Sequence, residues 1–165
     1  PYREDMQIRV QRSSDLQEVS DGLSLLVSDV PTIRAQLEQA RVAGAAVPAL
    51  EVGLAPKLLN DIAPGKATGA PPPVSMALYL QFSCHNQNVV LYAVGGTITF
   101  NELFSGDPNE SVGADKLTDA TFDVIMADPR DAIPGTLDIP DDKKSRVTGY
   151  FRFHFQRGQP GQPFP

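Results

Sequence analysis

Hydrophobic and polar residues alternate in several stretches of the chain, and this alternation predicts β-strands. In the first stretch, Met6, Ile8 and Val10 alternate with polar residues. Because neighbouring side chains of a strand point to opposite faces, a period of two predicts a strand with one buried face. The apolar stretch over residues 16–27 contains the turn signal Asp21-Gly22, so we expect two short strands joined by a hairpin here.

Helical spacing replaces this alternation after residue 28. We expect a first helix over residues 30–43, whose apolar positions fall close to one face: Val30, Ile33, Leu37 and Ala40. Asp29 is a candidate N-cap, Pro31 suits a first helical turn, and Gly44 suits the end of the helix. A second short helix is expected over residues 54–62, with these apolar residues on one face: Leu54, Leu58, Leu59 and Ile62.

Residues 63–73 are rich in proline, glycine and alanine, which predicts a linker or a long surface loop. From residue 74 onward the pattern is that of strands. The continuous apolar run over residues 89–94 fits a strand buried on both sides, or a strand that enters a bulge at Gly95-Gly96. In the last strand, one face is apolar: Val147, Gly149, Phe151, Phe153 and Phe155. No helix separates these strands, so we expect antiparallel pairing.

These elements predict a mainly β fold with a helical insertion at about residues 30–62. We expect an antiparallel β-sandwich or open barrel of about six or seven strands. Residues 1–156 are expected to form a single β-rich domain, and residues 157–165 an extended tail rich in proline, glycine and glutamine.

Composition and charge narrow the class of protein. The 165 residues include 15 prolines and 13 glycines, which gather in the loops and the tail rather than in the predicted strands. The net charge is −6 and no cluster of Lys and Arg stands out, so nucleic acid is not an expected partner. The longest apolar run, residues 89–94, is too short to span a bilayer.

The start of the chain and the single cysteine bear on location. The first residues lack the pattern of a signal peptide and the chain does not begin with Met, so we expect a mature or trimmed product. A signal sequence or lipid anchor upstream is left open. One cysteine together with many prolines and glycines fits the cytosol or a Gram-negative periplasm. We expect an extracytoplasmic location in the periplasm, at the outer membrane or outside the cell, with the cytoplasm as the alternative.

The sequence carries no motif of a common enzyme class. It lacks a Gly-x-Ser-x-Gly elbow, a phosphate-binding loop and a dinucleotide fingerprint. With two histidines and one cysteine, we expect no metal site and no cofactor. Cys84 falls on the apolar face of its strand and His85 would point to the other face, so an unreactive buried thiol is expected.

The candidate binding residues are Tyr150, Arg152 and His154, which share the polar face of the last strand. Tyrosine, arginine and histidine together are typical of recognition surfaces. The alternatives are an ordinary solvated sheet face or a face covered by the helices. If the surface binds, we expect an anionic or protein partner rather than catalysis.

Three functional hypotheses follow. The first is a non-enzymatic module of the cell envelope, or a secreted module, that acts through protein-protein contacts or self-assembly, including as a subunit of a larger assembly. The second is a small-ligand or carbohydrate-binding barrel. Its stacking groups would be Tyr79, Tyr92 and Tyr150, and an apolar interior would be lined by Phe151, Phe153 and Phe155. The third is a hydrolase that uses loop carboxylates such as Asp128 and Asp131, which we otherwise expect to be solvated turn residues without calcium-loop spacing.

Overall fold

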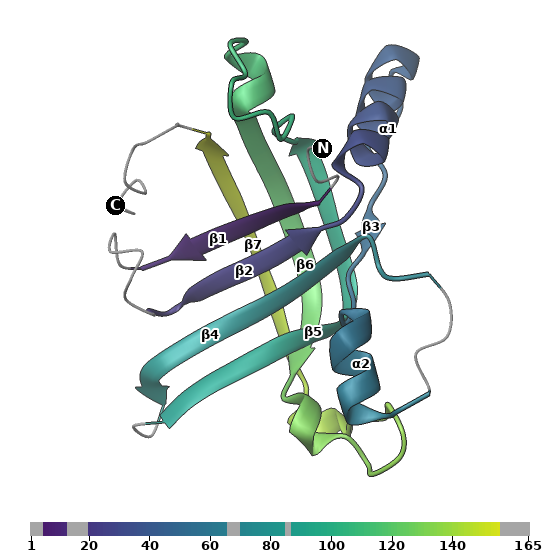
Figure 1. Ribbon diagram of the computed structural model, residues 1–165, viewed down its shortest axis with the longest axis vertical. Helices are drawn as coiled ribbons and strands as arrows, with labels where there is room; N and C mark the ends of the chain where they lie inside the picture. Colours follow the sequence, from purple (N-terminus) through teal and green to yellow (C-terminus); the bar gives the residue numbers. More distant parts are fainter. Residues whose placement is uncertain (1–4, 13–19, 66–69, 85–86, 156–165) are drawn as a thin grey trace.

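The computed structural model describes residues 5–12, 20–65, 70–84 and 87–155 (Figure 1). In chain order, the main elements are β1 (Met6–Gln11), β2 (Gly22–Val27), α1 (Val30–Ala43), β3 (Leu50–Glu51), α2 (Pro56–Ile62), β4 (Val74–Cys84), β5 (Gln87–Glu102), β6 (Leu117–Ala127) and β7 (Ser145–His154). Three single-turn 3-10 helices lie in the loops: η1 (Ala114–Lys116), η2 (Pro129–Asp131) and η3 (Asp141–Lys143). The predicted tail at 157–165 and residues 66–69 of the predicted loop lie outside the described residues.

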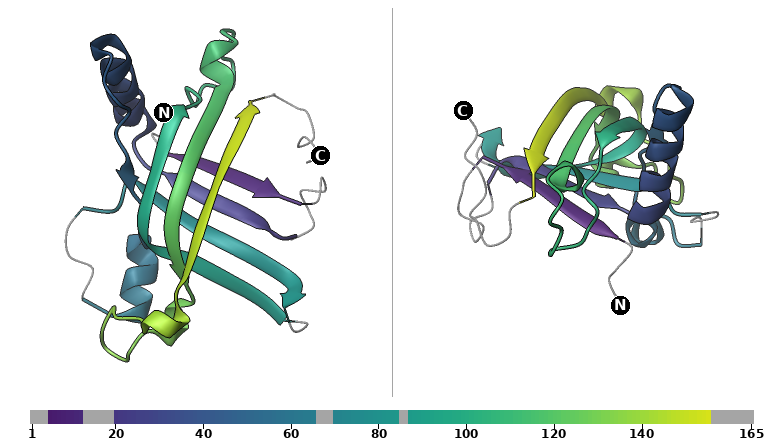
Figure 2. Two further views of the ribbon diagram at one scale, coloured as in Figure 1. Left: turned by 180° about the vertical axis from the view of Figure 1, so that it is seen from behind. Right: turned by 90° about the horizontal axis from the view of Figure 1, so that it is seen from above.

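The strands form one antiparallel sheet of seven strands that curls into a half-barrel. Its order is β1-β2-β4-β5-β6-β7, and the short β3 pairs with β5 beside this path. Strands β1, β2 and β4 form one wall and run across β6 and β7 of the other wall (Figures 1 and 2). The expectation of an open antiparallel barrel with about six or seven strands is therefore confirmed.

Strand β5 belongs to both walls and bends between them. Its first part pairs with β4 and its second part with β6. The register with β6 shifts between Ala93 and Gly95, which marks the predicted bulge. Gly96 has a φ of 109°, and a Cβ atom there would lie 2.4 Å from the carbonyl oxygen of Asp123. Only glycine fits this conformation and this close approach, so the bend depends on Gly96.

The core lies between the two walls. Alternating residues of β6 point into it, as the sequence predicts: Ala120, Phe122, Val124 and Met126. Phe100 and Ile98 of β5 and Leu25 of β2 are fully buried on the same side. Helix α1 covers one end of the half-barrel, because Val30, Ile33 and Leu37 belong to the same cluster of buried residues. The hydrophobic face predicted for this helix is thus the face that packs.

The ends of α1 also match the sequence. The Asp29 side chain accepts a hydrogen bond from the N–H of Thr32 at 3.2 Å, which is the N-cap contact. Gly44 follows the helix with a φ of 60°, the left-handed conformation that ends many helices. Helix α2 begins at Pro56 rather than at residue 54, and none of its residues is fully buried. It lies outside the half-barrel, near β4 and β5 (Figure 1).

One detail near the start of the chain differs from the simplest expectation. Asp21-Gly22 opens β2 instead of turning between two strands within residues 16–27. β2 pairs antiparallel with β1, and the N–H of Arg12 donates to the carbonyl oxygen of Asp21 at 2.8 Å. The hairpin therefore joins β1 to β2, and residues 13–19 between them lie outside the described part of the chain.

Two neighbouring glycines give a matched test of the bend. Gly96→Ala places a Cβ atom against backbone in a left-handed conformation, so we expect a loss of about 3 kcal/mol in the free energy of unfolding. Gly95→Ala is the control, because a Cβ atom at Gly95 meets nothing within 4 Å. Urea unfolding of both variants measures the difference, and equal unfolding midpoints would contradict this account of the bend.

Candidate functional site

The three candidate binding residues share an exposed face of β7. Tyr150 is 80% exposed, whereas its neighbour Phe151 is 6% exposed and belongs to the core. Arg152 and His154 are also exposed. This alternation follows from the strand geometry, because every second side chain points to the same face. Neither helix covers this face, so of the alternatives raised by the sequence, the covered face does not apply.

Two carboxylates of β6 accompany the arginines of β7. Asp119 lies opposite Arg152 in the strand register, and the nearest atoms of the two side chains, Oδ2 and Nε, are 3.7 Å apart. Asp123 accepts a hydrogen bond from Nε of Arg146 at 2.8 Å and a second bond from another nitrogen of the same guanidinium. Such a pairing neutralises charge locally, so the face is balanced rather than basic.

Asp119 and Asp123 were not identified as parts of the site from the sequence. Their positions on the polar face of β6 were readable from the alternation over residues 117–127. Their proximity to Arg146 and Arg152 depends on the register between β6 and β7, which periodicity does not give. The hydrogen bonds from Arg146 lower the pKa of Asp123, and the same contact raises the pKa of Arg146. Balanced charge weakens the expectation of an anionic ligand.

The backbone of β7 is paired on one side only. The N–H of Phe155 donates to the carbonyl oxygen of Lys116 at 2.8 Å, and the register with β6 continues without a shift to Ser145. In an antiparallel ladder, backbone groups of alternate residues point to opposite sides. The N–H and C=O groups of Tyr150, Arg152 and His154 therefore point away from β6. In the described part of the chain, no strand pairs with that side of β7.

Among the described residues, this open edge lacks several of the features that usually protect edge strands. Natural sheets protect their edges with proline, charged side chains (above all lysine), bulges, very short strands or a covering segment, and of these β7 has the charged Arg146 and Arg152. β7 has 10 residues with no proline or lysine, and its pairing with β6 shows no bulge. The other edge strand, β1, has 6 residues. The exposed side chains and the outward backbone groups of Tyr150, Arg152 and His154 thus lie together at the longer of the two edges.

The tyrosines of the ligand-binding hypothesis do not meet in one site. Tyr92 lines two hollows on either side of α2, with volumes of about 360 and 580 Å³. Tyr79 lies on the same outer face of the sheet, since it pairs with Val90 two residues from Tyr92. Tyr150 is separated from them by β6 and stands on the edge strand. A stacking platform of all three rings is therefore not formed.

The phenylalanine rings expected to line a ligand-holding interior pack on other rings. Phe151 lies 6.5 Å from Phe122 and 6.0 Å from Phe153, measured between ring centroids. Phe155 stacks on Phe104 with a centroid distance of 4.4 Å and an interplanar angle of 13°. Such pairs add to the hydrophobic stabilisation of the core. These contacts account for the apolar face of β7 by core packing.

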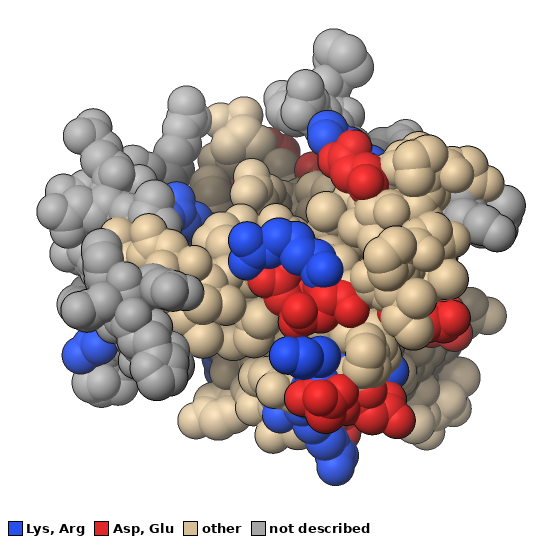
Figure 3. Space-filling view, turned by 90° about the horizontal axis from the view of Figure 1, so that it is seen from below, with Lys and Arg blue, Asp and Glu red and all other residues tan. Residues whose placement is uncertain are grey.

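The loop carboxylates act as caps and partners of arginine. Asp128 accepts a hydrogen bond from the N–H of Arg130 at 2.9 Å, and the side chain of Arg130 lowers the pKa of Asp128. A carboxyl group with a lowered pKa is ionised at neutral pH and is a poor general acid. Asp131 is exposed. At this end of the molecule, basic and acidic side chains lie side by side, with no large area of one sign (Figure 3).

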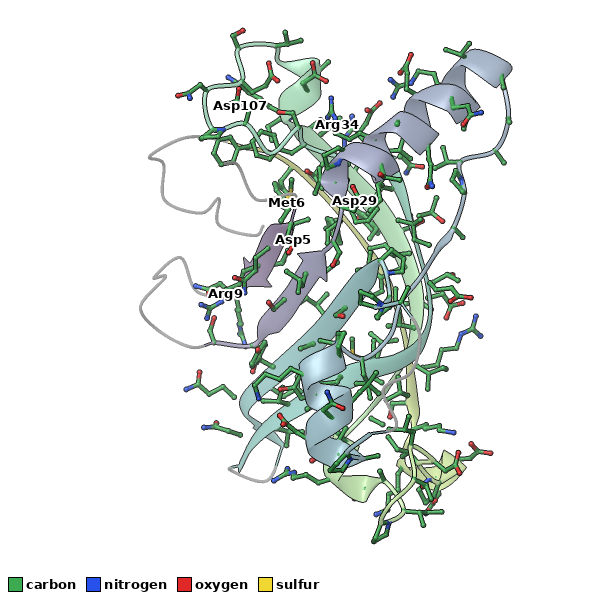
Figure 4. The ribbon with its side chains drawn as sticks, turned by 45° about the vertical axis from the view of Figure 1, so that its right-hand side comes forward. Asp5, Met6, Arg9, Asp29, Arg34 and Asp107 are labelled. Carbon is green, nitrogen blue, oxygen red and sulfur yellow. The ribbon has the colours of Figure 1, made fainter. Side chains whose placement is uncertain are left out.

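One partly buried charge contact ties α1 to the loop before β6. The guanidinium of Arg34 donates to the carbonyl oxygen of Leu103 and, at 2.6 Å, to a carboxylate oxygen of Asp115. Figure 4 shows Arg34 on α1 beside the loop that carries Asp107. The contact links α1 to the loop at this end of the half-barrel.

No other group of residues stands out as a site in the described regions. They contain no group of three or more His, Cys, Asp or Glu side chains that suits a metal ion. The side chain of Cys84 and the whole of His85 lie outside what the structure describes. None of the described helices is long and apolar enough to cross a membrane. Comparisons with models of protein families, with curated proteins and with solved structures give no match to this chain.

The ion pair between β6 and β7 gives a prediction about titration. Arg146→Gln removes the hydrogen bonds that favour the ionised form, so the pKa of Asp123 rises toward the ordinary value of an exposed aspartate. The pair stabilises the fold at neutral pH, and this contribution is lost as the pH falls through the lowered pKa of Asp123. A carboxyl ¹³C titration by NMR measures the shift. Arg152→Gln is the control and leaves the Asp123 titration in place; equal titrations of Asp123 in both variants would refute the assignment.

Proposed function

We propose that the protein is a non-enzymatic module that works through protein-protein contacts at the open edge of β7, including as a subunit of a larger assembly. One observation carries the proposal: Tyr150, Arg152 and His154 offer exposed side chains and, at the same edge, backbone groups that point away from β6. An edge of this kind binds an extended strand of another chain through main-chain hydrogen bonds.

The energetics favour such a contact. Each additional backbone hydrogen bond contributes about 0.5–1.5 kcal/mol net, and an added strand forms several of them in register. Tyr150 supplies a large ring with a polar tip, a type enriched at the centres of interfaces. The side chains next to Tyr150 along β7 set the partner's register, because cross-strand pairs of opposite charge are favourable and like charges directly opposite are unfavourable. Backbone groups supply the affinity in this arrangement, and side chains supply the choice of partner.

Charge balance supports a protein partner over an anion. Arg146 is paired with Asp123, and Arg152 has Asp119 at 3.7 Å, so little uncompensated positive charge is left on the face. A cell-envelope or secreted location belongs to the same proposal and rests on composition alone. The ligand-binding alternative has less support, because Tyr150 lies apart from Tyr79 and Tyr92 and the phenylalanines are packed in the core.

Site-specific photocrosslinking tests the proposal in the cells that produce the protein. Tyr150→benzoylphenylalanine should give a discrete covalent adduct on irradiation, because position 150 would lie in the contact. Val42→benzoylphenylalanine is the control, since Val42 is also 80% exposed but lies on α1. A chain that also carries Thr148→Pro, which removes an outward N–H and blocks strand addition, should lose the adduct.

A chain with Thr148→Val in place of Thr148→Pro should keep the adduct, because it keeps the backbone donor. The unfolding midpoints of both Thr148 variants verify that the fold is intact. Absence of any discrete adduct from position 150, with a stable and abundant protein, would refute the proposal.

A further inference from the structure

We propose that the partner at the β7 edge is a second copy of this chain, paired antiparallel with Tyr150 on the two-fold axis. This inference rests on the proposed function and names its partner. It comes from three observations on β7: which backbone groups face the edge, where the charged side chains stand, and what the inner face carries.

The backbone restricts the possible registers. The groups that face the open edge belong to alternate residues, among them Thr148, Tyr150 and Arg152. In an antiparallel pair, these residues must lie opposite the same set in the second copy. The two registers with the longest overlap of β7 with itself are therefore centred on Gly149 or on Tyr150. Each of them leaves a single residue at one end of β7 unpaired, whereas further shifts leave at least three.

The charged side chains distinguish these two registers. A pair centred on Gly149 places Arg146 directly opposite Arg152 of the second copy. The carboxylate neighbours of both arginines lie on β6 of their own chains, so the two like charges would still face each other across the edge, and like charges directly opposite destabilise a sheet. A pair centred on Tyr150 places Thr148 opposite Arg152, and Arg146 opposite His154. It also places the two Tyr150 rings opposite each other, which is a favourable cross-strand pair. The outer face thus selects the register centred on Tyr150.

The inner face fits the same register. Val147 and Phe153 are half-buried residues packed against the core, and the register places each opposite the other residue in the second copy. Pairing would cover the remaining exposed part of both side chains. Gly149 lies opposite Phe151 of the second copy. The space beside Gly149 is filled from within its own chain, because a Cβ atom there would lie 2.7 Å from the ring of Phe122. No side chain at Gly149 obstructs the approach.

The two-fold arrangement limits the assembly. Each copy uses the same edge, so the contact is closed and does not propagate through β7 into a fibre. The sheets of two half-barrels become continuous across the axis. Both sets of open backbone groups gain partners in a single step, and the contact leaves β1 as the remaining edge of each copy.

Cysteine crosslinking tests both the partner and the register. In a chain with Cys84→Ser, Tyr150→Cys places two thiols opposite each other, with Cα atoms about 5.5 Å apart, which is within the range for a disulfide. Thr148→Cys is the matched control on the same face. Its two copies would be offset by four residues, about 14 Å, and are too far apart to bond. With oxidised glutathione as the oxidant, we expect a disulfide dimer from Tyr150→Cys alone on a non-reducing gel.

Sedimentation of the chain without introduced cysteines provides the second measurement. We expect a dimer that dissociates on dilution, is lost with Thr148→Pro and is kept with Thr148→Val. A monomer at every concentration together with no Tyr150→Cys dimer would overturn the inference. A disulfide dimer from Thr148→Cys instead would overturn the register. A photocrosslink from position 150 to a different protein would overturn the second copy as partner while supporting the proposed function; no adduct at all would overturn both.

Discussion

Each backbone N–H and C=O group of a strand needs a hydrogen-bond partner, and a sheet that curls without closing leaves its two end strands with partners on one side only. This constraint organises the molecule. The inner strands are paired on both sides, and α1 covers one end of the core. In the described part of the chain, β7 keeps ten regular residues with an unpaired side. The candidate site is therefore a consequence of the architecture rather than an addition to it.

The bend in β5 divides the sheet into two walls. One strand pairs with β4 in the first wall and with β6 in the second, and Gly96 allows the close approach at the bulge between them. The walls then cross instead of running alongside each other, so β1 and β7 do not meet as paired neighbours (Figure 2). Gly96 thus allows one strand to belong to both walls around the core.

Local patterns in the sequence predict much of this fold. Apolar side chains are buried in the core, and this burial produces the period of two in β4, β6 and β7 and the apolar face of α1. The caps at Asp29 and Gly44 are also local, since they depend on a side chain and a conformation within one turn. The length of α2 was overestimated because an apolar face alone does not say where a helix begins.

Pairings between distant residues were not predictable. The contact of Arg146 with Asp123, and the direction in which the backbone of Tyr150 points, depend on the register of β6 with β7. A shift of one residue in that register would leave the alternation of apolar and polar residues in each strand unchanged. It would alter both the contact of Arg146 with Asp123 and the direction of the Tyr150 backbone groups. The sequence therefore predicted that Tyr150, Arg152 and His154 share a polar face, and the structure adds that this face is exposed and that the same residues carry the open backbone edge.

Amide hydrogen exchange of β7 at several protein concentrations tests the central claim most directly. In the dilute chain, the amides of Tyr150 and Arg152 should exchange fast, because they point away from β6, whereas the amides of Phe151 and Phe153 should be protected. On concentration, the exchange of Tyr150 and Arg152 should slow as the second copy pairs with the edge. Exchange at these two amides that is slow at every dilution, or fast at every concentration, would contradict the account.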